Sequence, residues 1–103
     1  VVAPGFIDLH VHLDPILKLL DCESHIRQGV TTALGGPDGR GPSPFGAYIE
    51  QLEAAGVGMN VAYLVGHNSI RKKVMGMENR SPTSAEMDSM KTRVTQAMEE
   101  NFF

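Results

Sequence analysis

Few features of this sequence point to a cross-linked, membrane-bound or nucleic-acid-binding protein. Among its 103 residues there is one cysteine, Cys22, and no tryptophan. A single cysteine excludes an intrachain disulfide and is typical of a reducing compartment, so we expect a cytoplasmic location. No apolar run approaches the roughly 20 residues that a membrane-spanning helix needs. The formal net charge of -3 at pH 7 provides no basic surface, so we expect neither membrane nor nucleic acid as partners.

Signals at the chain ends are also missing. The sequence has no initiator methionine, and it begins with an apolar stretch in place of the basic start and cleavage site of a signal peptide. It ends on two phenylalanines, with no cap after a helical pattern. We therefore expect an internal fragment, in which residues 1–103 form part of one domain and are incomplete at both ends.

The most chemically informative stretch is 4–12, PGFIDLHVH, which ends with two histidines one residue apart. A nearly continuous apolar run after Pro-Gly is typical of a buried parallel strand. In a strand, residues two apart point to the same face and start about 6.6 Å apart, so His10 and His12 can bind one metal ion. Two hydrogen-bonded core histidines would give the same pattern. Asp8, on the same face, fits either support of metal ligands or a hydrogen bond at the strand end.

Helix and strand patterns alternate along the rest of the chain. The spacing of apolar residues predicts helices over 14–28, 43–56 and 70–75, a further helix after residue 83, and strands over 30–34 and 57–65. Ser43 is expected to cap the second helix, and Gly56 to end it. Thr83 and Glu86 have the spacing of a capping box. Gly and Pro are dense in the loop 35–42, which lets the backbone approach a ligand closely.

This alternation predicts an α/β fold with a parallel sheet and right-handed connections. Three strand–helix units do not close a sheet, whereas a TIM-type (β/α)8 barrel needs eight, in about 250 residues. We expect the first three βα units of such a barrel. An open three-layer sheet is the competing architecture, but the glycine-rich fingerprint of its nucleotide-binding form is absent after the first strand.

With these residues in view, the sequence resembles the amidohydrolase superfamily of metal-dependent barrel hydrolases. The superfamily's metal motif on the first strand is similar to PGFIDLHVH. Two further stretches, IRQGVTTALGGPDG and NVAYLVGHNSIRKKVMG, are similar to the second and third strand regions of its N-acyl-D-amino-acid deacylase (D-aminoacylase) branch. Together the three stretches cover well over half of the chain.

The resemblance implies a zinc-dependent reaction, with one or two divalent ions bound by His10 and His12. Water activated by the metal would hydrolyse the linear amide bond of a small-molecule N-acyl amino acid. The ligand between the two metals, often a cysteine in this branch, falls on Asp38. A carboxylate suits zinc, although Pro-Asp-Gly is also a good turn by itself. The later histidines and the acid that serves as general base have no counterpart, so no catalytic residue is expected within the chain, and the chain alone should not turn over substrate.

Several other polar residues each allow a functional and a structural interpretation. His67 and Arg71 are expected to line the substrate pocket, with Arg71 as a bidentate partner for the substrate carboxylate. A plain loop histidine and a solvated basic face fit them equally well. Asp14 would either reach the site or cap the first helix. Structural roles are expected for Cys22 and His25, and a place in the core for Met87, Met90 and Met98.

Two rival functions remain open. One is a cyclic-amide hydrolase of the same superfamily, similar to dihydroorotase or hydantoinase, in which a carboxylated lysine on a later strand bridges the metals. The other is a non-catalytic binding or scaffold domain that retains barrel motifs. Metal content of the intact protein separates a hydrolase from a scaffold, and the sequence does not fix the oligomeric state.

Overall fold

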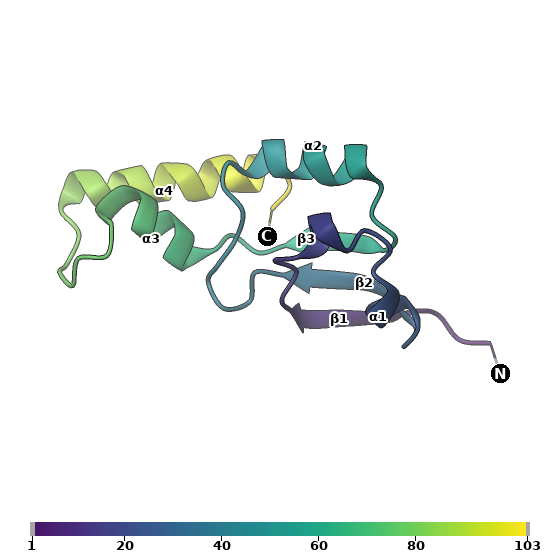
Figure 1. Ribbon diagram of the computed structural model, residues 1–103. Helices are drawn as coiled ribbons and strands as arrows, with labels where there is room; N and C mark the ends of the chain where they lie inside the picture. Colours follow the sequence, from purple (N-terminus) through teal and green to yellow (C-terminus); the bar gives the residue numbers. More distant parts are fainter. Residues whose placement is uncertain (1, 103) are drawn as a thin grey trace.

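The computed structural model describes residues 2–102, and a parallel sheet of three strands lies at its centre. Strands β1 (Phe6–Val11), β2 (Val30–Gly35) and β3 (Asn60–Tyr63) lie side by side in that order (Figure 1). Helical segments connect them, because parallel neighbours need a crossover rather than a tight turn. The predicted α/β class with a parallel sheet is confirmed.

The segment 14–28, predicted as one helix, is broken into two short pieces. These are a 3-10 helix, η1 (Ile16–Lys18), and α1 (Glu23–Ile26), separated by Cys22 in the left-handed region at φ 50°. The physical reason is a tertiary contact. Gly58, just before β3, donates its N–H to the Leu20 carbonyl at 2.7 Å, and a Cβ on Gly58 would lie 2.6 Å from the Asp21 carbonyl oxygen. The turn before β3 therefore packs directly against the backbone where the helix would have continued.

Helix α2 (Phe45–Ala55) covers one face of the sheet (Figure 1). It buries Phe45 and Leu52 and ends, as predicted, at Gly56, which has φ 74° and donates its N–H to the Leu52 carbonyl. Its start differs from the prediction because Ser43 does not cap it.

At that start, the N-cap position is Pro44, and the Glu100 carboxylate accepts the Gly46 N–H at 2.9 Å. The Ser43 hydroxyl instead accepts from the Lys73 ammonium at 3.0 Å. A carboxylate near a helix N-terminus interacts favourably with the helix dipole. The cap is thus supplied by a residue 54 positions away along the chain, which a local pattern cannot reveal.

Helices α3 (His67–Met75) and α4 (Ser84–Glu99) form a pair that extends past the carboxyl ends of the strands (Figure 1). Helix α3 begins three residues earlier than predicted, so His67 is its first residue. The predicted capping box of α4 is confirmed. The Thr83 hydroxyl accepts the Glu86 N–H, and the Glu86 carboxylate accepts the Thr83 N–H at 2.8 Å.

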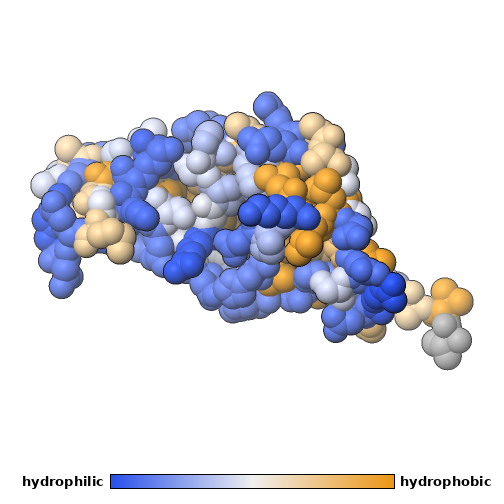
Figure 2. All heavy atoms as spheres, viewed as in Figure 1, coloured by the Kyte–Doolittle hydropathy of each residue, from blue (hydrophilic) through white to orange (hydrophobic). Residues whose placement is uncertain are grey.

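The molecule is elongated, 55 × 25 × 22 Å, with a radius of gyration of 15.7 Å, whereas a compact domain of about 100 residues has about 13 Å. Apolar side chains stay exposed on the edge strand β1 and on α4. The largest exposures on β1 belong to Phe6, Ile7 and Leu9. Figure 2 shows apolar atoms gathered around the sheet end of this face, while the α3–α4 end is mostly hydrophilic.

The core itself lies between the sheet and the helices. Within residues 2–102, Ala33 and Ala97 are fully buried, and Phe102 packs against Phe45 and Tyr63. Met90 packs against this core, but Met87 and Met98 are 40% and 51% exposed, so the prediction that they are core residues is wrong for this chain. No helix in the described part of the chain is long and apolar enough to cross a bilayer.

Candidate metal centre

The first strand carries a local irregularity at the histidine pair. Its pairing with β2 moves from Asp8–Ala33 to Val11–Gly35, so β1 uses one residue more than β2 over this stretch. At this irregularity the Asp8 carboxylate accepts the backbone N–H of His10 at 3.0 Å, so this N–H has a hydrogen-bond partner. Of the two readings of Asp8, the structure shows the strand hydrogen bond. Extra residues of this kind redirect side chains at sheet edges.

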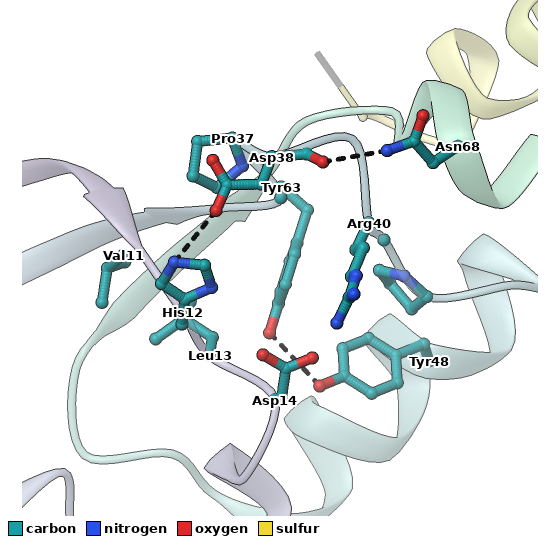
Figure 3. A pocket seen from close by; sticks show the side chains of 13 residues that line it. Val11, His12, Leu13, Asp14, Pro37, Asp38, Arg40, Tyr48, Tyr63 and Asn68 are labelled. Atoms are coloured by element: carbon teal, nitrogen blue, oxygen red, sulfur yellow. Dashed lines mark hydrogen bonds and ion pairs between the residues drawn. The ribbon is translucent and has the colours of Figure 1, made fainter.

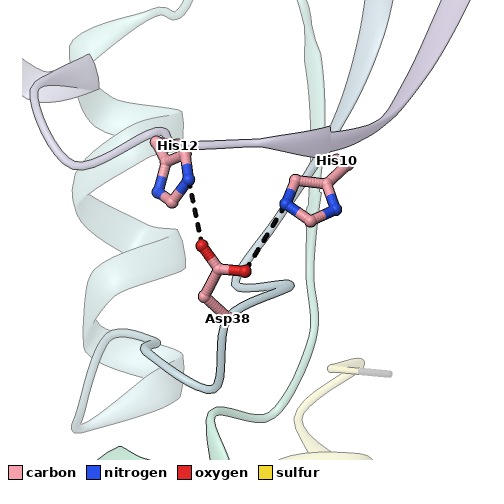
Figure 4. A group of neighbouring side chains, drawn as sticks. All are labelled: His10, His12 and Asp38. Atoms are coloured by element: carbon pink, nitrogen blue, oxygen red, sulfur yellow. Dashed lines mark ion pairs between the residues drawn. The ribbon is translucent and has the colours of Figure 1, made fainter.

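His10 and His12 direct their rings toward the same carboxylate (Figure 4). His10 Nε2 lies 3.4 Å from Asp38 Oδ1, and His12 Nε2 lies 3.0 Å from Asp38 Oδ2. The ring centroids are 6.2 Å apart, close to the spacing expected for a strand. The two imidazoles therefore share one side of the backbone and converge with a residue 26 positions further along the chain.

The donor set and its dimensions fit a divalent ion. One ligand atom from each of His10, His12 and Asp38 lies within 4.8 Å of the other two. Two imidazoles and a carboxylate are ligands that zinc takes in proteins, and both imidazoles lie within 3.4 Å of the Asp38 carboxylate. Each histidine faces a different oxygen of the Asp38 carboxylate. All three side chains are at least half exposed, at 65%, 64% and 50%.

Glycines let the loop after β2 fold back toward the histidines. Gly36 has φ 84°, and a Cβ there would lie 2.8 Å from the Leu64 carbonyl oxygen. Gly66 is similarly close to this loop, since its Cβ would lie 2.5 Å from the Gly41 nitrogen. Only glycine allows both the left-handed turn and the close approach of the two backbones. The loop 36–41 is thus held against the segment that follows β3.

The start of α3 fixes this loop by hydrogen bonds. The N–H groups of Asn68 and Ser69 both donate to the Gly39 carbonyl, at 2.8 and 3.2 Å. The Asn68 side-chain amide donates to the Asp38 carbonyl at 3.2 Å, and the Ser69 hydroxyl bonds to both the N–H and the carbonyl of Gly41. The free N–H groups of a helix N-terminus thus hold the residue that follows Asp38.

A recess of about 540 Å³ opens beside His12 and Asp38 (Figure 3). Its deep wall carries two tyrosines whose hydroxyls are 3.2 Å apart, Tyr48 and Tyr63. Burial, followed by the hydrogen bond to Tyr48 and the nearby charge of Asp14, raises the pKa of Tyr63 above its usual range. The Tyr63 hydroxyl therefore stays protonated at physiological pH. The other charged residues along the recess are Asp14 and Arg40.

Asp14 lines this recess and is not a helix cap. The N-cap of η1 is Pro15 and that of α1 is Cys22, and neither helix has a side-chain cap hydrogen bond. Of the two readings of Asp14, the structure therefore favours proximity to the site.

The structure does not bring His67 and Arg71 to the cluster. His67 is exposed at the first position of α3, where its ring lies 3.4 Å from the Asn68 side-chain oxygen. The Arg71 guanidinium donates to the carbonyls of Glu78 and Arg80, at 2.9 and 3.0 Å, and to the Met75 sulfur. These bonds tie down the loop between α3 and α4. The substrate-binding roles of His67 and Arg71 stay predictions.

Cys22 and His25 have the structural surroundings that the sequence predicts. The buried Cys22 thiol donates to the Leu20 carbonyl, and the His25 ring lies 3.3 Å from the Ser24 hydroxyl. The sequence reasoning missed Arg40, Asn68 and Ser69. The available signal was the glycine-rich loop itself, because a loop with this many glycines needs hydrogen-bond partners from a neighbouring segment.

No family model matches the chain. The D-aminoacylase of Alcaligenes xylosoxydans xylosoxydans is 34% identical over 122 aligned residues, covering 95% of this chain and 25% of the relative. A solved N-acyl-D-glutamate deacylase from Bordetella bronchiseptica, complexed with zinc and a phosphonate mimic of the tetrahedral intermediate, is 32% identical with a TM-score of 0.86. A D-aminoacylase structure that concerns the function of a binuclear metal centre is 33% identical with a TM-score of 0.84.

Coverage is unequal in all these matches. Each of the two structures matches 94% of this chain, but the matched part is only 25% or 26% of the solved protein. The chain thus spans about a quarter of the length of the relatives that it matches. The alignment with D-aminoacylase is longer than the 103 residues of this chain, so the relative has inserted residues that are absent here.

Proposed function

We propose that this chain supplies the metal-binding part of an N-acyl-D-amino-acid deacylase. The premise is that its homologues and structural neighbours are such deacylases, of the amidohydrolase family. The reaction is hydrolysis of the amide bond of an N-acyl-D-amino acid. The single observation that carries the proposal is the convergence of His10, His12 and Asp38 from two segments of the chain.

These three residues would hold one or two divalent ions, and we propose zinc because two imidazoles and a carboxylate suit it. A bound ion of this kind supplies Lewis-acid polarisation of an amide carbonyl and a nucleophile from water at neutral pH. The chain's own contribution is to place and orient the ligands. The Asp8 carboxylate holds the backbone N–H of His10, and the hydrogen bonds from α3 fix the loop that carries Asp38.

For the architecture we propose the first three βα units of a (β/α)8 barrel, with residues 1–103 as part of that domain. The ligands support this, because they lie at or just beyond the carboxyl ends of β1 and β2, where barrel active sites lie. The exposed Phe6, Ile7 and Leu9 on the edge strand also support it, since barrel closure removes such edges. A general base is expected outside these residues, so the full-length protein is the form to assay. We propose a cytoplasmic location for it.

The test is metal content and hydrolysis in three variants of the full-length protein, His10→Ala, His12→Ala and Asp38→Ala. Each removes one ligand, so we expect zinc affinity to fall at least about 10- to 100-fold, as even loss of a supporting partner does. Hydrolysis of N-acetyl-D-amino acids should fall with it. His25→Ala is the matched control and should keep both. Full zinc content in the His10→Ala and His12→Ala variants, by elemental analysis, would refute the assignment.

A further inference from the structure

The recess beside the metal-binding cluster contains one cation, Arg40, among the residues that line it. Arg40 follows Asp38 by two positions on the same glycine-rich loop, and its side chain reaches past the tyrosine wall toward Tyr48 and Asp14 (Figure 3). A molecule whose reacting amide lies at His12 and Asp38 would therefore extend along this guanidinium.

Within residues 2–102 the Arg40 side chain makes no hydrogen bond or ion pair. Arg71, the other arginine near the loop, donates to two carbonyls and a sulfur atom, so three of its five N–H donors are already used. A guanidinium has five N–H donors in a planar fork that matches a carboxylate. Arg40 is exposed and lines the recess, and its fork has no partner among the residues that the structure describes.

The surroundings of Arg40 supply a further donor and an opposing charge. The hydroxyls of Tyr48 and Tyr63 bond each other, so the pair leaves one O–H as a neutral donor beside the recess. Asp14 and Asp38 place negative charge on the same recess, so its net charge does not attract an anion. Selection for an anion must therefore come from direct bonds to the guanidinium.

We propose that Arg40 binds a carboxylate of the N-acyl amino acid and selects acids over their uncharged amides, an inference that rests on the proposed function. The carboxylate has two sources, the α-carboxylate that every such substrate carries and a second one on an acidic side chain. Both sources present a carboxylate to Arg40, and binding of two pairs of ligands distinguishes the α-carboxylate from the side-chain carboxylate.

The experiment measures binding to the metal-free full-length protein by calorimetry, so that no hydrolysis takes place. N-acetyl-D-methionine and its carboxamide report on the α-carboxylate, and N-acetyl-D-glutamate and N-acetyl-D-glutamine report on the side chain. We expect one acid to bind about 10- to 100-fold more tightly than its uncharged partner, because hydrogen bonds to charged groups are the strong ones. Arg40→Met should remove this preference, and Arg40→Lys should keep part of it.

Two controls separate a direct bond from a general effect of charge. Arg27→Met removes an exposed arginine that pairs with Glu23 on α1, and it should leave the preference intact. In the double variant Asp14→Asn with Arg40→Met, the preference should stay lost. If the preference for the acid returned in the double variant, Arg40 would act only by neutralising Asp14, and the proposal would be overturned. An unchanged preference for the acid in Arg40→Met would overturn it as well.

The outcomes for Arg40 and for the proposed function are independent. A metal-loaded protein that hydrolyses N-acetyl-D-amino acids while Arg40→Met keeps the full acid preference contradicts the role of Arg40 alone. A metal-free protein that selects acids through Arg40, but has no hydrolase activity when loaded with zinc, contradicts the proposed function alone.

Discussion

At the scale of single residues, the candidate metal centre depends on glycines as much as on its ligands. Gly36 occupies a conformation that other residues rarely adopt, and it lies against the Leu64 carbonyl. Gly56 has nearly the same φ, 74° against 84°, but nothing lies within 4 Å of its virtual Cβ. The two positions therefore separate backbone strain from steric contact.

We expect Gly36→Ala to lower the thermal midpoint of the full-length protein more than Gly56→Ala does. Both variants carry the strain of a left-handed residue, about 1–2 kcal/mol, and only Gly36→Ala adds a contact at 2.8 Å. Gly36→Ala should also reduce zinc content, because the loop with Asp38 must move. Equal midpoints for the two variants would show that the Leu64 contact is not a constraint.

Ser69 is the second residue with a measurable effect on the loop. Ser69→Ala removes both hydrogen bonds to Gly41 and should destabilise the protein by about 1 kcal/mol. The loss should extend to weaker zinc binding, measured by competition with a chelator. Ser89→Ala, at an exposed position of α4, is the control and should change neither. Unaltered zinc affinity in Ser69→Ala would mean that Gly41 does not help to position Asp38.

At the scale of elements, the local sequence predicted the structure correctly where interactions between residues close in the chain determine it. The His10–His12 convergence follows from the two-residue period of a strand, and the α4 start follows from Thr83 and Glu86. The helix over 14–28 failed because Gly58 packs on Leu20 and Asp21 from 37 or more positions away. Contacts of this kind have no signature in the segment that they disrupt.

The same limit applies to the roles of the arginines. Arg71 lies in a motif that resembles the third strand region of the deacylases, yet its donors bind carbonyls of its own loop. Arg40 has no helical or strand pattern around it, and only the folding of loop 36–41 against α3 directs it into the recess. The pattern around Arg40 therefore gave no reason to single it out, and the substrate-binding role of Arg71 stays a prediction.

The capping box of α4 should make stability depend on acid pH. Two hydrogen bonds from Arg80, with those from Thr83, lower the pKa of Glu86 from its ordinary value of 4.5 to about 2. A lowered pKa stabilises the folded state above pH 4.5, and this contribution is lost as the pH falls toward 2.

We therefore expect Glu86→Gln to unfold at a lower denaturant concentration than the wild type at pH 7. The difference between the two unfolding midpoints should shrink as the pH falls from 4.5 toward 2. Glu99→Gln, which changes an exposed carboxylate at the other end of α4, is the control. A Glu86→Gln difference of the same size at pH 7 and pH 2 would contradict the coupling to Arg80.

At the scale of the whole molecule, the carbonyl of Gly39 has a consequence that reaches beyond the loop. It accepts the N–H groups of Asn68 and Ser69 at the start of α3, and α3 packs along α4, so hydrogen bonds join the loop that carries Asp38 to the projecting helix pair. If a cation binds at Asp38 and this link transmits the change, then a displacement of the helix pair changes cation affinity by the same factor by which the cation favours that displacement.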